Sequence, residues 1–159
     1  MDQHVAQGIG EFIYRRRIQY RDTDASGMVH FSAFFVFCEE AEHALWREVG
    51  LSVEPRQTEI GWPRVSASFE FLRALRFEDD IEVHLRVVGK TAKTLAYQAL
   101  IMHAGRIAAA GTMTTICVEK RAGQPLRAIE MPPEVAARFT VVPAIDVPSR
   151  RPPRSPSQV

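Results

Sequence analysis

The stretch from Arg21 to Phe34 reads RDTDASGMVHFSAF and separates a strand-like segment from an amphipathic helical pattern. It contains two carboxylates, one glycine, one histidine and small hydroxyl residues. Carboxylates beside a helix start can combine a base or nucleophile with outward-pointing backbone N–H groups, which stabilise developing negative charge. We therefore expect the chemistry of this protein to lie in this loop.

The segment before the loop, residues 12–20, predicts a strand. One parity is apolar or aromatic and the other is polar, with Arg16 as the exception. The first set is Phe12, Tyr14, Ile18 and Tyr20, and the second is Arg15, Arg17 and Gln19. This alternation indicates a strand with one buried face.

The segment after the loop predicts a helix over about residues 33–49. Ser32 is the expected N-cap and Gly50 the expected stop. Apolar residues recur at three- and four-residue spacing, which indicates one buried face. They are Phe34, Phe37, Cys38, Ala41, Leu45 and Val49.

Four further strand-like runs follow, over about residues 65–71, 81–87, 95–101 and 107–118. The last two are expected to form a hairpin around His103–Arg106. Their alternation favours an antiparallel sheet with one wetter face. One strand, one long helix and four strands predict an α+β fold in which the helix crosses a curved sheet.

The chain has 159 residues, of which 46% are hydrophobic and 25% charged. This is enough apolar material for one globular domain. We place the domain at residues 11–141, with a short helical segment near 134–139 at its end. Residues 1–10 and 142–159 are expected to be disordered, because the tail from Pro143 holds five prolines, three arginines and three serines.

Bulk properties exclude several partners. The net charge is +1 with both signs interspersed, which gives no case for nucleic acid. No apolar run reaches the roughly 18 residues of a membrane span. Cys38 and Cys117 have no metal-ligand spacing and are expected to be buried free thiols, so no metal is predicted and the protein is expected in a reducing cytoplasm.

Three chemistries fit Asp22-Thr23-Asp24. A phosphatase would use both acids with Glu78–Asp80 as metal ligands, but it needs a buried parallel strand before them, and the alternating residues 12–20 do not provide one. An enoyl-thioester hydratase would pair Asp24 with His30. A thioesterase would use Asp24 as nucleophile or general base, with helix-start N–H groups on the acyl carbonyl. Alternatively, the polar residues are only turn formers and caps.

The run YRDTDASGMV at residues 20–29, followed by Phe34, Glu39 and Ala41, resembles the signature of the 4-hydroxybenzoyl-CoA thioesterase family. This hot-dog-fold family includes the acyl-CoA thioesterases associated with the bacterial Tol-Pal system. The resemblance continues through residues 63–65, 77–80 and 126–132, and covers about residues 12–139. It implies a single hot-dog domain, with a five-stranded curved antiparallel sheet wrapped around one long helix.

The resemblance assigns roles within the loop. It makes Asp24 the catalytic carboxylate and Asp22 a structural partner. Gly27 would let the thioester approach the backbone, and the backbone N–H of Phe31 would hold the acyl carbonyl. Relatives often have tyrosine or histidine at position 31, whereas this chain has phenylalanine there and His30 one residue earlier.

The resemblance also implies a substrate site formed between subunits of a homodimer or homotetramer. The substrate would be an acyl-CoA or an acyl-carrier thioester, so coenzyme A enters as part of the substrate and no separate cofactor is expected. The substrate-binding candidates are His30, Phe34, Glu39, Lys90 and Lys93. Of these, Glu39 would face the acyl end and the two lysines the phosphates of the nucleotide. Glu42 stands where many relatives have arginine.

We therefore expect an acyl-CoA thioesterase for a small or medium acyl or aroyl group. Two alternatives stay open: a non-catalytic acyl-CoA-binding protein and the hydratase, although the sequence around His30 lacks the Asn-Pro and downstream Asp expected for the latter. The sequence leaves the acyl group undefined, because Phe34 and its aromatic neighbours could line a pocket or belong to the core.

Overall fold

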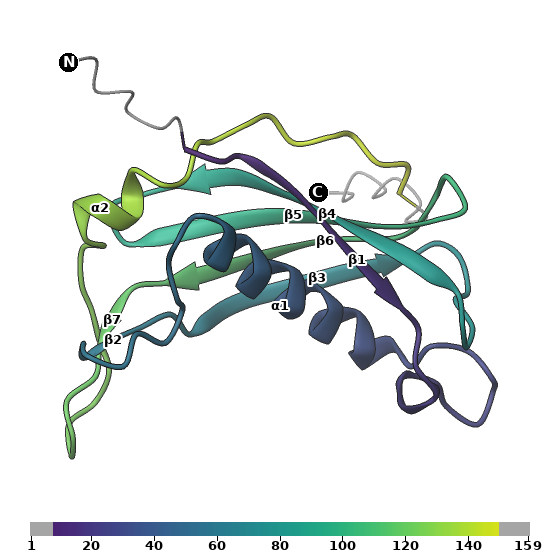
Figure 1. Ribbon diagram of the computed structural model, residues 1–159, viewed down its shortest axis with the longest axis horizontal. Helices are drawn as coiled ribbons and strands as arrows, with labels where there is room; N and C mark the ends of the chain where they lie inside the picture. Colours follow the sequence, from purple (N-terminus) through teal and green to yellow (C-terminus); the bar gives the residue numbers. More distant parts are fainter. Residues whose placement is uncertain (1–7, 150–159) are drawn as a thin grey trace, which may run out of the picture.

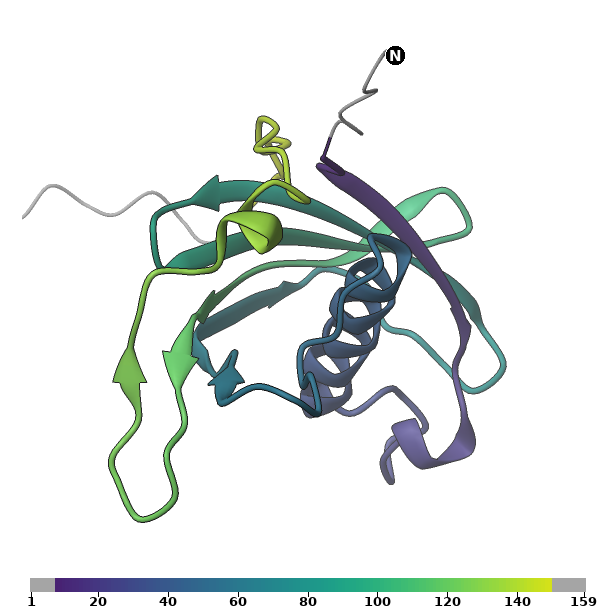
Figure 2. The ribbon, with the colours of Figure 1, turned by 60° about the vertical axis from the view of Figure 1, so that its left-hand side comes forward.

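The computed structural model describes residues 8–149. Five antiparallel strands form a curved sheet in the order β1-β4-β5-β6-β3, and the 18-residue helix α1 (Phe31–Glu48) lies across its concave face (Figures 1 and 2). The strands are β1 (Glu11–Arg17), β3 (Arg64–Phe71), β4 (Asp80–Lys90), β5 (Thr94–His103) and β6 (Arg106–Ile116). The predicted α+β architecture of one helix and five strands is confirmed.

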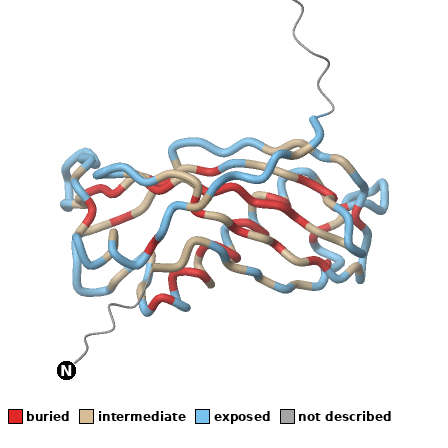
Figure 3. The backbone as a smooth tube through the Cα atoms, turned by 90° about the horizontal axis from the view of Figure 1, so that it is seen from above, coloured by how far each residue is buried: buried red, intermediate tan, exposed pale blue. Residues whose placement is uncertain are grey.

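The core lies between α1 and the sheet. Buried residues alternate along β4 as the sequence predicted, whereas β5 is buried without a break from Tyr97 to Ile101. Figure 3 shows the buried positions concentrated along the strands and the helix. The inward-facing residues of these strands are at most 2% exposed: Ile81, Val83, Leu85, Val87, Leu95, Tyr97, Ala99 and Ile101. The predicted apolar face of the helix packs against them.

The helix starts two residues earlier than predicted. His30, not Ser32, is the N-cap, because its ring nitrogen Nδ1 accepts the Ser32 N–H at 3.2 Å. An imidazole thus takes the place of the expected hydroxyl acceptor. Gly50 follows the helix end with a φ of 78°, a conformation that favours glycine.

The two edge strands differ from the prediction. In β1 Arg16 shares the inward parity of Phe12 and Tyr14, whereas Tyr20 lies in a 3-10 turn (Tyr20–Asp22) and is 79% exposed. In β3 the apolar residues are not buried, and Val65 and Phe71 are 56% and 40% exposed. An edge strand has a neighbour on one side only, so alternation in its sequence does not guarantee burial.

Three short strands were not predicted, and the expected short helix near residues 134–139 lies slightly earlier. A second sheet has the order β2-β7-β8, built from β2 (Ile60–Gly61), β7 (Val118–Glu119) and β8 (Arg127–Ala128). Strands of two residues are too short to show alternation. Helix α2 covers only Pro133–Ala136.

The ends of the domain reach further than expected. Residues 142–149 run along the outer side of the sheet (Figure 1), where the side chain of Gln98 donates to the Ile145 carbonyl at 2.6 Å and accepts the Ile145 N–H at 2.8 Å. At the other end, Ile9 bridges to Phe139. These backbone groups have found partners, so the structure differs from the expected disorder over 8–10 and 142–149. Residues 1–7 and 150–159 lie outside the described residues.

Cys38 and Cys117 are buried and free, as predicted, and burial raises the pKa of both thiols. No helix within residues 8–149 is long and apolar enough to cross a membrane.

Candidate active site

Residues 23–29 form a tight turn between β1 and α1. Thr23 bridges to Val29, the Asp24 N–H donates to the Met28 carbonyl at 3.0 Å, and the Gly27 N–H donates to the Asp24 carbonyl at 3.0 Å. Gly27 has a φ of 77°, and a Cβ placed there would meet only Arg76 Nη1, at 3.8 Å. The backbone conformation, rather than lack of space, therefore favours glycine at this position.

The Asp24 carboxylate is exposed and is held by its own turn. Its Oδ1 accepts the Ser26 N–H at 2.8 Å and also the Ser26 hydroxyl. These hydrogen bonds to the charged form, first from the hydroxyl and then from the backbone, lower the pKa of Asp24 below its ordinary value. At neutral pH Asp24 is thus an ionised, accessible carboxylate, as a nucleophile or general base must be.

Asp22 has the opposite environment although it lies only two residues away. Its carboxylate is buried, and both oxygens accept hydrogen bonds from Arg16, at 2.5 Å and 3.2 Å. The Gln19 N–H also donates to Asp22 Oδ2, at 2.7 Å. Asp22 is therefore occupied as a structural acceptor, and Asp24 is the carboxylate of this loop that is available for chemistry.

The start of α1 offers a backbone N–H beside this loop. The first N–H groups of a helix have no acceptor in a preceding turn. Those of Ser32 and Ala33 are used by the ring and the carbonyl of His30, and that of Phe31 has no acceptor among the described residues. The helix cap uses only Nδ1 of the His30 ring, so Nε2 is the nitrogen through which His30 would act in the hydratase alternative.

Two cavities flank the helix start. One, of about 300 Å³, has an apolar floor formed by Phe31, Phe34 and Phe71 and continues along residues 72–75. Phe34 is buried and meets the Phe71 ring edge-on, 5.0 Å between centroids. The other, of about 380 Å³, is polar and includes Arg21, Asp22, Thr23, His30 and Ser32. Phe31 thus lines an apolar cavity that could receive an acyl group, and so does Met28, whose carbonyl accepts the Asp24 N–H.

The structure does not bring every predicted site residue to this loop. Lys90 is at the far end of β4 from Asp80, which pairs with Arg17 just before the loop, so roughly 33 Å separate the two ends of the strand. Its ammonium donates to the carbonyls of Ala136 and Phe139 at 2.9 and 2.8 Å and so holds the end of α2.

Lys93 and Glu39 are also distant from Asp24 within one protomer. Lys93 lies in the exposed turn after β4. Glu39 is exposed on α1, about 12 Å along the helix from Phe31. It lines a different cavity of about 460 Å³ with Trp62 and Arg64.

A model of the thioesterase-like superfamily matches residues 18–139, which is well over half of the chain. The chain belongs to the thioesterase-like superfamily. This confirms the resemblance seen in the sequence and assigns the protein to the thioester hydrolases.

Individual members of the superfamily are similar to this chain over most of their own length. A presumed esterase from Aquifex aeolicus is 32% identical over 126 residues, which cover 78% of this chain and 94% of that protein. The 1,4-dihydroxy-2-naphthoyl-CoA hydrolase of Trichodesmium erythraeum is 30% identical over 112 residues, covering 67% and 81%. A crystal structure of a 4-hydroxybenzoyl-CoA thioesterase variant with 4-hydroxybenzoyl-CoA has a TM-score of 0.73 at 18% identity, covering 83% of this chain and all of that one. The hot-dog fold is thereby confirmed.

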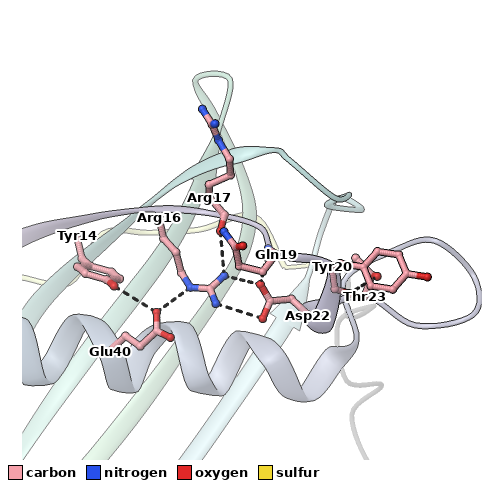
Figure 4. A network of polar contacts seen from close by, with 8 residues as sticks. All are labelled: Tyr14, Arg16, Arg17, Gln19, Tyr20, Asp22, Thr23 and Glu40. Atoms are coloured by element: carbon pink, nitrogen blue, oxygen red, sulfur yellow. Dashed lines mark hydrogen bonds and ion pairs between the residues drawn. The ribbon is translucent and has the colours of Figure 1, made fainter.

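Sequence reasoning missed one residue of this thioesterase-superfamily site, Arg16. Its guanidinium lies between two carboxylates, Asp22 and Glu40 (Figure 4). Its Cζ is 4.3 Å from the centroid of the Phe37 ring. Burial alone would lower the pKa of Arg16, but its hydrogen bonds and charge interactions with both acids raise it. The signal was present in the sequence, since Arg16 was the one residue that broke the alternation of the first strand.

A second, partly buried ion pair joins α1 to β3. Glu42, only 1% exposed, accepts a hydrogen bond from Arg64 Nη2. Glu42 Oε1 and Arg64 Nη1 are buried without a partner among the described residues. The cation that neutralises Glu42 thus comes from the neighbouring strand β3.

The described part of the chain, residues 8–149, contains no group of three or more His, Cys, Asp or Glu side chains placed to hold a metal ion.

Proposed function

We propose that this protein is an acyl-CoA thioesterase in which Asp24 acts on a thioester whose carbonyl is held by the Phe31 N–H. The observation that carries the proposal is the pairing of an ionised, accessible carboxylate with an unused N–H at the start of α1, next to an apolar cavity. The similarity to 1,4-dihydroxy-2-naphthoyl-CoA hydrolases supports a small or medium aroyl or acyl group as the substrate. A carrier-bound thioester would present the same reacting atoms.

The chemistry follows from these two groups. The Phe31 N–H, with the positive end of the α1 dipole, would stabilise the oxyanion that forms when the carbonyl carbon is attacked. Asp24 would either attack that carbon, giving an acyl-enzyme anhydride and coenzyme A thiolate before water releases the acid, or take a proton from an attacking water. Either route ends in a carboxylic acid and a free thiol.

We further propose a homodimer or homotetramer as the active form. In one protomer Asp24 and Phe31 are exposed, and the apolar residues Val65 and Phe71 of the edge strand β3 are open to solvent. A partner subunit would cover such surface and complete the walls of the substrate site. The free thiols of Cys38 and Cys117 fit a cytoplasmic location.

Thiol release from a panel of aliphatic and aromatic acyl-CoAs tests the proposed function. We expect Asp24→Asn to lower kcat by roughly 10²-fold or more, because the group acts directly in the chemistry. Asp146→Asn, which changes an exposed aspartate in the segment along the outer side of the sheet, is the matched control and should keep full activity. Full activity in Asp24→Asn would exclude the mechanism, and loss of an enoyl absorbance without thiol release would instead support a hydratase.

A further inference from the structure

We propose that Arg16 is a positioning residue for the thioesterase reaction, which holds the Asp24 loop in register with the first turn of α1. This inference rests on the proposed roles of Asp24 and of the Phe31 N–H. Arg16 itself touches neither of them, so it would act through Asp22 and Glu40.

The contacts of Arg16 join three elements. Its side chain is 9% exposed and points inward from β1. Its terminal nitrogens donate to the two oxygens of Asp22 in the loop, and Nε donates to Glu40 Oε2 in α1 at 2.8 Å. The guanidinium also lies over the Phe37 ring, which restricts its plane. Strand, loop and helix are therefore fixed to one rigid planar group.

Asp22 transmits this constraint to both reacting groups. It precedes Asp24 by two residues, so its position sets where the turn of Asp24 begins. Its carbonyl accepts the His30 N–H at 2.9 Å, and His30 directly precedes Phe31. A shift of Asp22 would thus move the Asp24 carboxylate relative to the Phe31 N–H, and misplacement by about 1 Å can cost 10²-fold in rate.

The chemistry of this position requires arginine rather than any cation. A guanidinium has donors in a fixed plane and can meet one carboxylate with two nitrogens while Nε meets another. A lysine ammonium is a single point donor on a flexible stem and cannot hold both acids in this geometry. Arg16→Lys is therefore the informative change, because it keeps the charge and removes the fork.

The test compares Arg16→Lys with Arg17→Lys. Arg17 is the matched control, since it is the next residue of β1 and makes a two-nitrogen pair with Asp80, at 2.8 and 3.1 Å, on the exposed side of the strand. We expect Arg16→Lys to lower kcat for an aroyl-CoA by roughly 10- to 100-fold with KM within about threefold. Hydrogen exchange of the His30 amide should become faster in the same variant. Arg17→Lys should leave kcat and the exchange rate unchanged.

A purely structural role would give a different pattern. If Arg16→Lys melts at a lower temperature but keeps kcat and His30 exchange at a temperature where it is folded, the proposal is overturned. If Arg16→Lys does not fold, Glu40→Gln, which leaves the Arg16–Asp22 pair in place, should show the same changes to a smaller extent, and an unchanged kcat and exchange rate there would equally overturn it. A wild-type protein without thiol release would refute the proposed function, while exchange of the His30 amide would still decide whether Arg16 holds the loop.

Discussion

Helix α1 is tied to both edge strands of the sheet by partly buried ion pairs, and the two pairs differ. On the β1 side Arg16 donates to Glu40 and Asp22, so its polar groups are matched. On the β3 side Arg64 donates to Glu42, but one atom of each partner stays without a hydrogen bond among the described residues. Glu40 and Glu42 point to opposite edges because residues two apart are rotated by about 200° around a helix.

The two ion pairs are expected to differ in how rigidly they hold the residues around them. A satisfied buried network has one low-energy arrangement and rigidifies its surroundings, whereas a partly satisfied one carries a desolvation cost without that benefit. The satisfied pair lies beside the loop with Asp24, where a displacement would disturb two reacting groups. The unsatisfied pair borders the cavity of about 460 Å³ and is remote from that loop.

The largest expected effect comes from breaking the satisfied network. Arg16→Met leaves the buried carboxylate of Asp22 without its cation, and we expect the free energy of unfolding to fall by about 3–5 kcal/mol. Denaturant unfolding of the folded protein measures this. Arg17→Met removes an exposed pair on the same strand and should cost about 1 kcal/mol or less. Equal losses in the two variants would show that the Arg16 network contributes no more than a surface pair.

An intermediate effect, of opposite sign, is expected on the β3 side. Replacing the whole pair with Glu42→Leu and Arg64→Leu removes two unsatisfied polar atoms from the interior, so the free energy of unfolding should stay constant or rise by up to about 3 kcal/mol. The single variant Arg64→Leu is the control, and it should be destabilised because it leaves the Glu42 carboxylate unpaired. A double variant as unstable as Arg64→Leu would contradict the difference between the two sides.

The smallest effect concerns Asp24, which belongs to neither pair. Ser26→Ala removes the hydrogen bond that contributes most to its low pKa, so the pKa of Asp24 should rise and the acid limb of the kcat/KM profile should move to higher pH. Ser52→Ala removes a similar local bond to the Glu54 N–H and is the control. An unmoved acid limb in Ser26→Ala would show that another group titrates there.

The lowered pKa of Asp24 also makes the stability of the folded protein depend on pH. The pKa of Asp24 is lower in the folded than in the unfolded chain, so its contribution is present above the unfolded pKa and is lost as the pH falls through the folded pKa. Ser26→Ala should therefore slightly lower the unfolding midpoint at neutral pH, leave it nearly unchanged below the folded pKa, and so weaken its dependence on pH in the acidic range. Asp24 is fully exposed, so this effect should be small.

Periodicity was enough to predict the central strands and the long helix, because residues that face a common core must recur at the period of their element. For β3 it predicted the strand but not the exposure of its apolar residues, because an edge strand has a neighbour on one side only. It failed for the second sheet, whose strands have two residues each, and for the segment 142–149, which is held by hydrogen bonds with Gln98.

The turn with Asp24, Ser26 and Gly27 was accessible from the sequence by itself, because the hydrogen bonds of these three residues are made within the turn. The distinction between Asp22 and Asp24 entered the sequence analysis through family resemblance, and its physical cause became visible only in the fold. Arg16 is 24 residues from Glu40, and only the packing of β1 against α1 brings them together around Asp22. Tertiary structure decided which carboxylate is used for support and which is free for chemistry, since a buried charge must find its partner wherever the chain folds back to provide one.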